Sequence, residues 1–219
     1  MPAQTFHCKD AGELAARMAS HVAKIMNTAA NATSISIPGG RDIVPFLQAF
    51  SKQEVDWSRV HAFMTDERLA TRDAAANNFP QADALLFSKA KNIHPYPFDE
   101  AKGLDAYNRA FFSRTQGKMD IVLLGMGEDG HIASLFPRHP ALASEEKGFI
   151  PISDAPLPFK ERISLSPAAI RNADHVFLYA ASASKQNAFE AFQDPTMSEQ
   201  ECPAKLALRA KQLWVYTIF

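Results

Sequence analysis

The stretch that decides the fold is DIVLLGMGEDGHIASLFP, which runs from Asp120 to Pro137. It begins with a near-continuous apolar run, Ile121 to Leu124, and such a run is typical of a strand with both faces buried in a parallel sheet. The run leads directly into a loop that contains Gly125, Gly127 and Gly130. Ligands of open parallel sheets bind where loops leave the carboxyl ends of strands. The sequence therefore predicts a buried strand followed by a loop that lines a site.

The three glycines also match the G-x-G-x-x-G pattern of dinucleotide-binding loops, in which the backbone approaches a pyrophosphate at a helix start. Here the spacer holds Glu128 and Asp129, whose carboxylates would repel that anion. The helix that should follow is interrupted by Pro137 and Pro140. A ribose-binding acid is expected roughly 20 residues further on, and EEKGFIPISD at residues 145–154 is a poor match. The pattern therefore does not favour a dinucleotide site.

The side chains of the loop offer a second interpretation. Asp129 and His131 are two residues apart, and such positions can face the same way on an extended or turn backbone. A carboxylate beside an imidazole orients the ring, selects its tautomer and raises its basicity. The alternative is a glycine-rich turn in which the Asp129 side chain bonds its own backbone. Spacing alone leaves both interpretations open.

Other apolar runs indicate alternating strands and helices. We expect strands at residues 34–37, 60–64, 120–125, 162–166, 175–181 and 213–219, and helices at residues 10–32, 42–50, 78–91, 101–115, 167–172, 184–192 and 203–211. This alternation predicts an α/β fold: a doubly wound, mostly parallel sheet with helices on both faces, of the Rossmann-like kind. Residues 136–158 are rich in proline and are expected to form a flap or a linker. We expect one domain over residues 1–219.

The loop after the strand at residues 60–64 has a charged start, Thr65–Arg68, and is expected to run on as a long loop to residue 78. At the carboxyl end of a strand, carboxylates such as that of Asp66 suit sugar hydroxyls, and Arg68 suits an anion or an oxyanion. The alternative is a solvated, charged turn.

Three cations could meet a phosphate at the same edge of the sheet. The loop Pro38–Arg41 opens a helix, and paired glycines at a helix start form a phosphate cradle that Arg41 could reinforce. Arg162 begins an expected strand, and Lys185 begins an expected helix. The alternatives are an ordinary glycine turn and surface charges.

The composition bounds the classes of partner. The net charge of -1 gives no bulk field to gather nucleic acid or an anionic membrane, so an anion site must be local. Cys8 and Cys202 are too far apart in sequence for a metal-type spacing, and a reducing compartment fits them. The polar start lacks a signal-peptide core, and no apolar run approaches the ~18 residues of a membrane span. We expect a soluble, cytoplasmic protein.

Taken in order along the chain, these motifs resemble the 6-phosphogluconolactonase family and, more distantly, the glucosamine-6-phosphate deaminases that share its fold. The matching pieces are Gly39-Gly40, Thr65–Arg68, Asn78 ten residues after Arg68, Gly125–Pro137, Arg162–Leu165 and Lys185. The long motif Gly125–Pro137 is specific, whereas the others support it.

The resemblance implies hydrolysis of 6-phospho-D-glucono-1,5-lactone to 6-phosphogluconate, a step of the oxidative pentose phosphate pathway, with no metal or organic cofactor. It implies that His131 is the catalytic base, with Asp129 beside it, and that Arg68 could stabilise the oxyanion. The implied substrate-binding residues are Asp66 at the sugar ring and Gly39, Gly40, Arg162 and Lys185 at the phosphate. A monomer and a small homo-oligomer both fit the sequence.

The chain departs from the family pattern around its glycine pair. Pro38 stands where the family usually has Ser, and Arg41-Asp42 stands where it usually has a Ser/Thr-Pro step. One phosphate contact through a hydroxyl is therefore in doubt, and Arg41 is expected to substitute for it.

Two rival functions remain. A sugar-phosphate isomerase-deaminase would use a base such as Asp66, but the deaminases carry a further acid where this chain has Ser134–Pro137. A non-catalytic sugar-phosphate sensor would need the phosphate site without His131, and it would usually bring a partner-binding segment. The lactonase interpretation accounts for more of these residues than either rival.

Overall fold

The computed structural model describes residues 3–69 and 77–219. A parallel sheet of seven strands lies at its centre, in the order β1-β10-β9-β6-β2-β3-β5. The strands are β1 (Gln4–His7), β2 (Thr33–Ile37), β3 (Val60–Met64), β5 (His94–Tyr96), β6 (Ile121–Gly125), β9 (His175–Ala180) and β10 (Gln212–Thr217). The predicted α/β class with a mostly parallel sheet is confirmed.

The order in which the chain adds strands to this sheet changes direction between the neighbouring central strands β2 and β6. From β2 the chain moves outward through β3 to β5, whereas from β6 it moves the other way through β9 to β10, which pairs with the N-terminal strand β1 at the edge. The loops after β2 and β6 therefore leave adjacent strands towards opposite sides. In doubly wound sheets this switch point opens a crevice at the carboxyl ends of the strands, where ligands bind.

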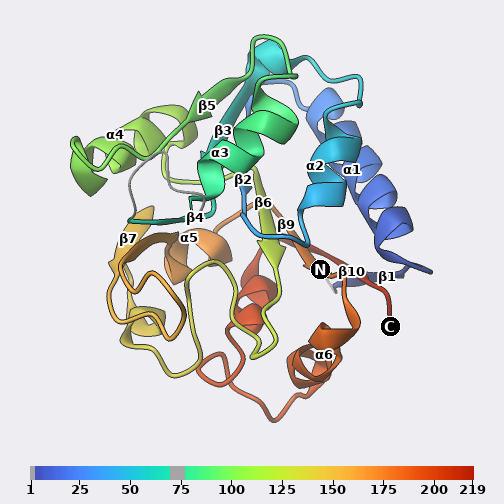
Figure 1. The fold of residues 1–219 in the computed structure, drawn as a ribbon, viewed down its shortest axis with the longest axis vertical. Coiled ribbons are helices and arrows are strands. Elements are labelled where there is room, and N and C mark those ends of the chain that lie inside the picture. Colours follow the sequence, from blue (N-terminus) through green and yellow to red (C-terminus); the bar gives the residue numbers. More distant parts are fainter. Residues whose placement is uncertain (1–2, 70–76) are drawn as a thin grey trace.

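Helices cover both faces of the sheet (Figure 1). They are α1 (Ala11–Thr28), α2 (Val44–Phe50), α3 (Asn78–Ala82), α4 (Gly103–Thr115), α5 (Pro167–Arg171) and α6 (Gln186–Gln193), with 3-10 turns at Trp57–Arg59, Pro140–Ala143, Ala183–Lys185 and Pro203–Arg209 and a π-helical turn at Asp83–Phe87. The apolar run of β6 serves both faces: Ile121 and Leu123 pack with α1 and α2, while Val122 and Leu124 pack with α4 and α5. This double burial explains why the run is continuous rather than alternating.

A second, antiparallel sheet of three strands lies beside the first, in the order β4-β8-β7. It consists of β4 (Asp66–Arg68), β7 (Phe149–Ile152) and β8 (Arg162–Leu165). Thr65 joins the two sheets, because its N–H donates to Ile37 of the central sheet at 2.9 Å and its carbonyl accepts from Leu165 at 2.8 Å.

This second sheet corrects three expectations. The strand at residues 162–166 exists but pairs outside the parallel sheet, and the stretch after Met64 begins with strand β4 rather than with a loop. The rest of that predicted loop, residues 70–76, lies outside the described residues. Residues 136–158 are neither a plain flap nor a linker, because they contain β7, which is fully paired with β8. Short pairing segments of this kind carry too weak a pattern to be found by periodicity.

Several boundaries also differ from those expected. The helix expected at residues 10–32 ends at Thr28, and residues 83–87 form a π-helical turn within the helix expected at 78–91. Residues 203–209 are 3-10 helix. Strands β1 and β5 were not predicted. Each lies at an edge of the parallel sheet, where a strand pairs on one side only and need not be apolar throughout.

Within residues 3–69 and 77–219, no helix is long and apolar enough to cross a bilayer.

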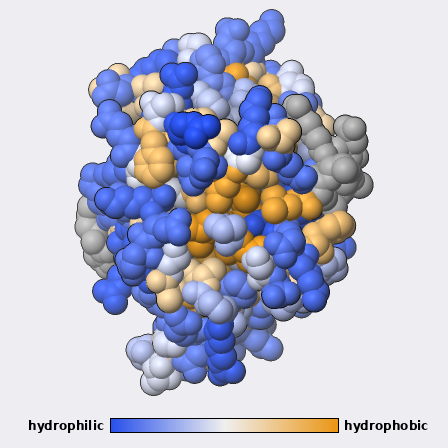
Figure 2. All heavy atoms as spheres, turned by 90° about the vertical axis from the view of Figure 1, so that its left-hand side faces the viewer, coloured by the Kyte–Doolittle hydropathy of each residue, from blue (hydrophilic) through white to orange (hydrophobic). Residues whose placement is uncertain are grey.

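Figure 2 shows the face that lies at the left of Figure 1, near α4 and β7. It is largely hydrophilic, with a cluster of hydrophobic residues near its middle.

Phe63 of β3 tests the packing between the sheet and α4. Its ring is fully buried, stacks on Tyr96 at 4.5 Å between centroids and meets Phe111 edge-on at 5.8 Å. We predict that Phe63→Ala lowers the free energy of unfolding by about 3–5 kcal/mol, because the truncation leaves a cavity. Urea unfolding measures this. Phe112→Ala on α4 is the control, because Phe112 is 39% exposed and should cost far less; equal losses would contradict the packing.

Candidate active site

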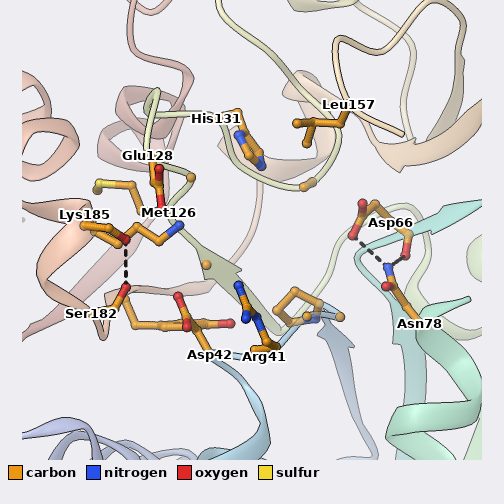
Figure 3. A pocket seen from close by; sticks show the side chains of 18 of the residues that line it. Arg41, Asp42, Asp66, Asn78, Met126, Glu128, His131, Leu157, Ser182 and Lys185 are labelled. Atoms are coloured by element: carbon orange, nitrogen blue, oxygen red, sulfur yellow. Dashed lines mark hydrogen bonds between the residues drawn. The ribbon is translucent and has the colours of Figure 1, made fainter. Parts of the chain in front are cut away.

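A pocket of about 440 Å³ lies at the switch point between β2 and β6 (Figure 3). The predicted site residues that line it are Gly39, Gly40, Arg41, Asp66, Arg68, His131, Arg162 and Lys185. They come from the loops after β2 and β6, from β4 and β8, and from the 3-10 turn that precedes α6. The structure thus brings together side chains that are up to about 150 residues apart in sequence. Asp129 does not line the pocket but contacts a residue that does.

His131 is held on three sides. Its Nδ1 lies 2.6 Å from Asp129 Oδ1, and its ring packs against Phe136 at 4.9 Å between centroids. Beside it, a Cβ on Gly127 would come within 2.0 Å of Nδ1, so any other residue there would displace the imidazole. In Figure 3 the ring lies at one side of the pocket, opposite Arg41. Nε2 is therefore the nitrogen left for a ligand.

Asp129 both shapes the turn and binds the imidazole. Its Oδ1 accepts from the backbone N–H of His131 at 3.1 Å as well as contacting Nδ1. Burial alone would raise the pKa of the Asp129 carboxyl, but the hydrogen bonds from His131 hold it below its usual range. The carboxylate is therefore charged at neutral pH. A charged carboxylate can only accept, so the neutral imidazole carries its proton on Nδ1 and its lone pair on Nε2.

Two more cations line the pocket. They are Arg41 and Lys185, and within the described residues neither is in an ion pair, although the carboxylates of Asp42 and Glu128 line the same pocket. In Figure 3, Lys185 lies beside Glu128 and Arg41 lies beside Asp42, on two different segments. Cationic side chains that no carboxylate within residues 3–69 and 77–219 pairs with suit an anionic ligand.

Sequence reasoning missed two hydroxyl groups beside Lys185. Ser182 and Ser184 line the pocket, and their Oγ atoms lie 3.3 Å apart. Ser182 precedes the 3-10 turn at Ala183–Lys185 and Ser184 lies within it, so serines at an expected helix start were the signal available in the sequence. They supply hydroxyls to the same pocket that the glycine pair lines, whereas the loop of the glycine pair at residues 38–42 has none.

Arg162 has a second set of partners besides the pocket. It is buried, and its Nε and Nη2 donate to the carbonyls of Phe159 and Pro158 at 2.8 and 2.6 Å. Its guanidinium also lies over the ring of Phe136, 5.7 Å from the centroid. Burial lowers the pKa of Arg162, and the Asp66 carboxylate opposes this effect. Arg162 therefore holds the β7–β8 loop, which also brings Leu157 to the pocket rim.

Asp66 reaches the pocket from β4 and is nearly fully buried. Asn78 donates from Nδ2 to the Asp66 carbonyl at 2.8 Å and to Oδ1 at 3.3 Å (Figure 3). The Asn78 side chain also fills the space beside Gly39, where a Cβ would lie 1.9 Å from its Oδ1. The first position of the glycine pair must therefore be glycine, because a side chain there would prevent the loop from packing against Asn78.

Glu67, which follows Asp66, points away into the protein. Its carboxylate accepts from the backbone N–H groups of Arg68, Asn78 and Phe79 at 2.7–2.9 Å. Burial raises the pKa of Glu67, although these three hydrogen bonds act in the opposite direction. Glu67 thus anchors the start of α3 to β4 and places Asn78. In the described residues, no group of three or more His, Cys, Asp or Glu side chains is arranged to hold a metal ion.

The fold and the pocket define the class: a parallel α/β protein whose pocket at the switch point is lined by basic side chains and by a histidine that contacts a carboxylate. The chain belongs to the family described as glucosamine-6-phosphate isomerases/6-phosphogluconolactonase, whose model matches residues 9–216.

Individual relatives agree with this assignment. The 6-phosphogluconolactonase of Borreliella burgdorferi is 36% identical over 196 residues, which cover 84% of this chain and 83% of that protein. The one from Streptomyces coelicolor is 32% identical over 219 residues, covering 89% of this chain and 84% of that protein. A crystal structure of a putative 6-phosphogluconolactonase from Neisseria gonorrhoeae superposes with a TM-score of 0.83 at 27% identity, over 99% of this chain and 100% of that one.

The tautomer of His131 is the first prediction from this geometry. We predict that neutral His131 is protonated on Nδ1, because Asp129 accepts from that nitrogen, and that its Nε2 shows the ¹⁵N chemical shift of an unprotonated imidazole nitrogen. Long-range ¹H–¹⁵N NMR spectra measure this directly. In Asp129→Ala the two tautomers should mix, whereas His139, whose ring bonds are elsewhere, should be unchanged. Protonation of His131 on Nε2 in the wild type would contradict the prediction.

Proposed function

We propose that this protein hydrolyses 6-phospho-D-glucono-1,5-lactone to 6-phospho-D-gluconate in the oxidative pentose phosphate pathway. The observation that carries the proposal is a histidine–carboxylate pair at a pocket that Arg41 and Lys185 also line, neither of them in an ion pair within residues 3–69 and 77–219. The relatives named above bear the same activity in their names. The proposal treats residues 1–219 as one catalytic domain, since the family model matches residues 9–216.

His131 acts as the general base. Its Nε2 takes a proton from water as the water oxygen bonds to the lactone carbonyl carbon, and the carbonyl π electrons move to its oxygen. Asp129 stabilises the imidazolium that forms. When the tetrahedral intermediate collapses, the bond to the ring oxygen breaks and the imidazolium returns its proton to that oxygen. General acid–base catalysis of this kind contributes about 10²- to 10⁴-fold.

The remaining site residues bind and orient the substrate. Arg68 stabilises the developing oxyanion, and Asp66 accepts a hydrogen bond from a hydroxyl of the sugar ring. The phosphate lies among the Gly39–Gly40 backbone, Arg41 and Lys185. Arg162, which the resemblance assigns to the phosphate, adds positive charge to the pocket and keeps the β7–β8 loop in place, because two of its nitrogens donate to carbonyls of that loop.

The rival functions fit the pocket less well. A deaminase would require a second acid in the segment after the histidine, and residues 134–137 of this chain contain none. A sensor would not require the Asp129–His131 pair.

A cytoplasmic location is part of the proposal. Cys8 and Cys202 are both free and buried, which suits a reducing compartment.

The role of His131 is tested with the lactone generated in situ from glucose 6-phosphate. We predict that wild-type protein accelerates hydrolysis and that His131→Ala loses at least about 10²-fold in kcat, the lower end of the contribution of a general base. His139→Ala is the control, because His139 lies outside the pocket lining. Full activity of His131→Ala would exclude the proposed base, and absence of wild-type acceleration would exclude the lactonase.

The proposed phosphate site is tested by comparing hydrolysis of a phosphorylated and an unphosphorylated lactone. We predict that Lys185→Met raises KM for the phosphorylated lactone about tenfold or more while hardly changing the hydrolysis of glucono-1,5-lactone, because only the former carries the dianion. Steady-state kinetics on both lactones measure the ratio. Lys89→Met, an exposed lysine outside the pocket, serves as the matched control. An equal loss on both lactones would place the phosphate elsewhere.

A further inference from the structure

Ser134 is a fully buried serine that has no role in the mechanism above. Its Oγ lies 2.7 Å from Asp66 Oδ2 and 3.4 Å from Arg162 Nη1. Both partners line the pocket, whereas Ser134 itself does not. It therefore lies directly behind two side chains that face the substrate.

The direction of this hydrogen bond is fixed by chemistry. A guanidinium has only donors, so Arg162 must donate to the Ser134 oxygen, and the single hydroxyl proton is left for the Asp66 carboxylate. Asn78 donates to the other carboxylate oxygen, Oδ1. Each oxygen of an ionised carboxylate has about two acceptor positions. Asp66 is therefore held from two sides and keeps acceptor capacity for a ligand in the pocket.

The backbone of Ser134 is fixed as firmly as its side chain. Its N–H donates to Ser164 Oγ on β8 at 3.2 Å. The preceding residue, Ala133, adopts a left-handed conformation with φ of 51°, and Leu135 N–H closes the turn on the Ile132 carbonyl at 2.9 Å. This turn follows His131 directly. The segment that carries the proposed base is thereby tied to the carboxylate that faces the sugar ring.

We propose that Ser134 is a positioning residue: its hydroxyl orients the Asp66 carboxylate so that it accepts a hydrogen bond from a hydroxyl of the bound sugar ring. This inference rests on the proposed function for the identity of the ligand. Since Asp66 contacts the ring rather than the reacting carbonyl, the orientation acts on substrate binding equally in the ground state and the transition state. Loss of such uniform binding raises KM and leaves kcat nearly unchanged.

The test is a double-mutant cycle with Ser134→Ala, Asp66→Asn and the double variant. We expect Ser134→Ala to raise KM for the phosphorylated lactone about tenfold and to change kcat by less than about threefold. If Ser134 acts through Asp66, its substitution should cost less than about twofold in the Asp66→Asn background. The same tenfold cost in both backgrounds, or an unchanged KM in Ser134→Ala, would overturn the proposal.

A matched control separates positioning from stability. Ser166 is also fully buried, and its Oγ accepts from the Ala169 N–H at the start of α5, away from the pocket. Ser166→Ala should lower the midpoint of thermal unfolding by a similar amount as Ser134→Ala but leave KM unchanged. An increase in KM in both variants would assign the effect to general destabilisation and overturn the proposal.

A crystal structure of Ser134→Ala gives a readout that needs no activity. The proposal expects the Asp66 carboxylate to rotate away from its present orientation, and an unchanged carboxylate would overturn it. Absence of lactone hydrolysis by the wild type would instead count against the proposed function, so the two failures are distinguishable.

Discussion

The divergence of the chain at β2 and β6 is the constraint on which the site depends. Adjacent parallel strands with connections to opposite sides leave their carboxyl ends uncovered, and the loops after them form the walls of the pocket. The loop after β2 brings the glycine pair and Arg41, and the loop after β6 brings His131. Parallel backbone pairing holds these two strands side by side, so the pocket is a consequence of topology before any side chain is considered.

The second sheet completes the pocket from one side. Thr65 passes directly from the end of β3 into β4, and its backbone bonds to both sheets. Because β4 and β8 are antiparallel neighbours, Asp66 and Arg162 come close together although they are far apart in sequence. Pairing between these short strands therefore adds a carboxylate and a guanidinium to the lining of the pocket.

Close packing explains the glycines of the loop after β6 better than nucleotide binding does. Gly127 leaves room for the imidazole of His131, and Gly125 leaves room for the hydroxyl of Tyr179. The glycine pair follows the same logic, since Gly39 leaves room for Asn78. These glycines admit the protein's own side chains to the wall of the pocket, and the charged spacer residues are then compatible with the site.

Local pattern determined the parts of this protein that local physics controls. Strands β2, β3, β6, β9 and β10 were readable in the sequence, most clearly β6, where burial of both faces makes the run continuously apolar. The sequence did not reveal the edge strands, the small antiparallel sheet, Ser182 and Ser184 in the pocket, or the bond from Ser134 to Asp66. Those features depend on contacts between distant segments, and the spacing of residues along the chain does not indicate which segments come into contact. Only the tertiary structure determined these contacts, because it brings the carboxyl ends of separate strands to one edge of the sheet.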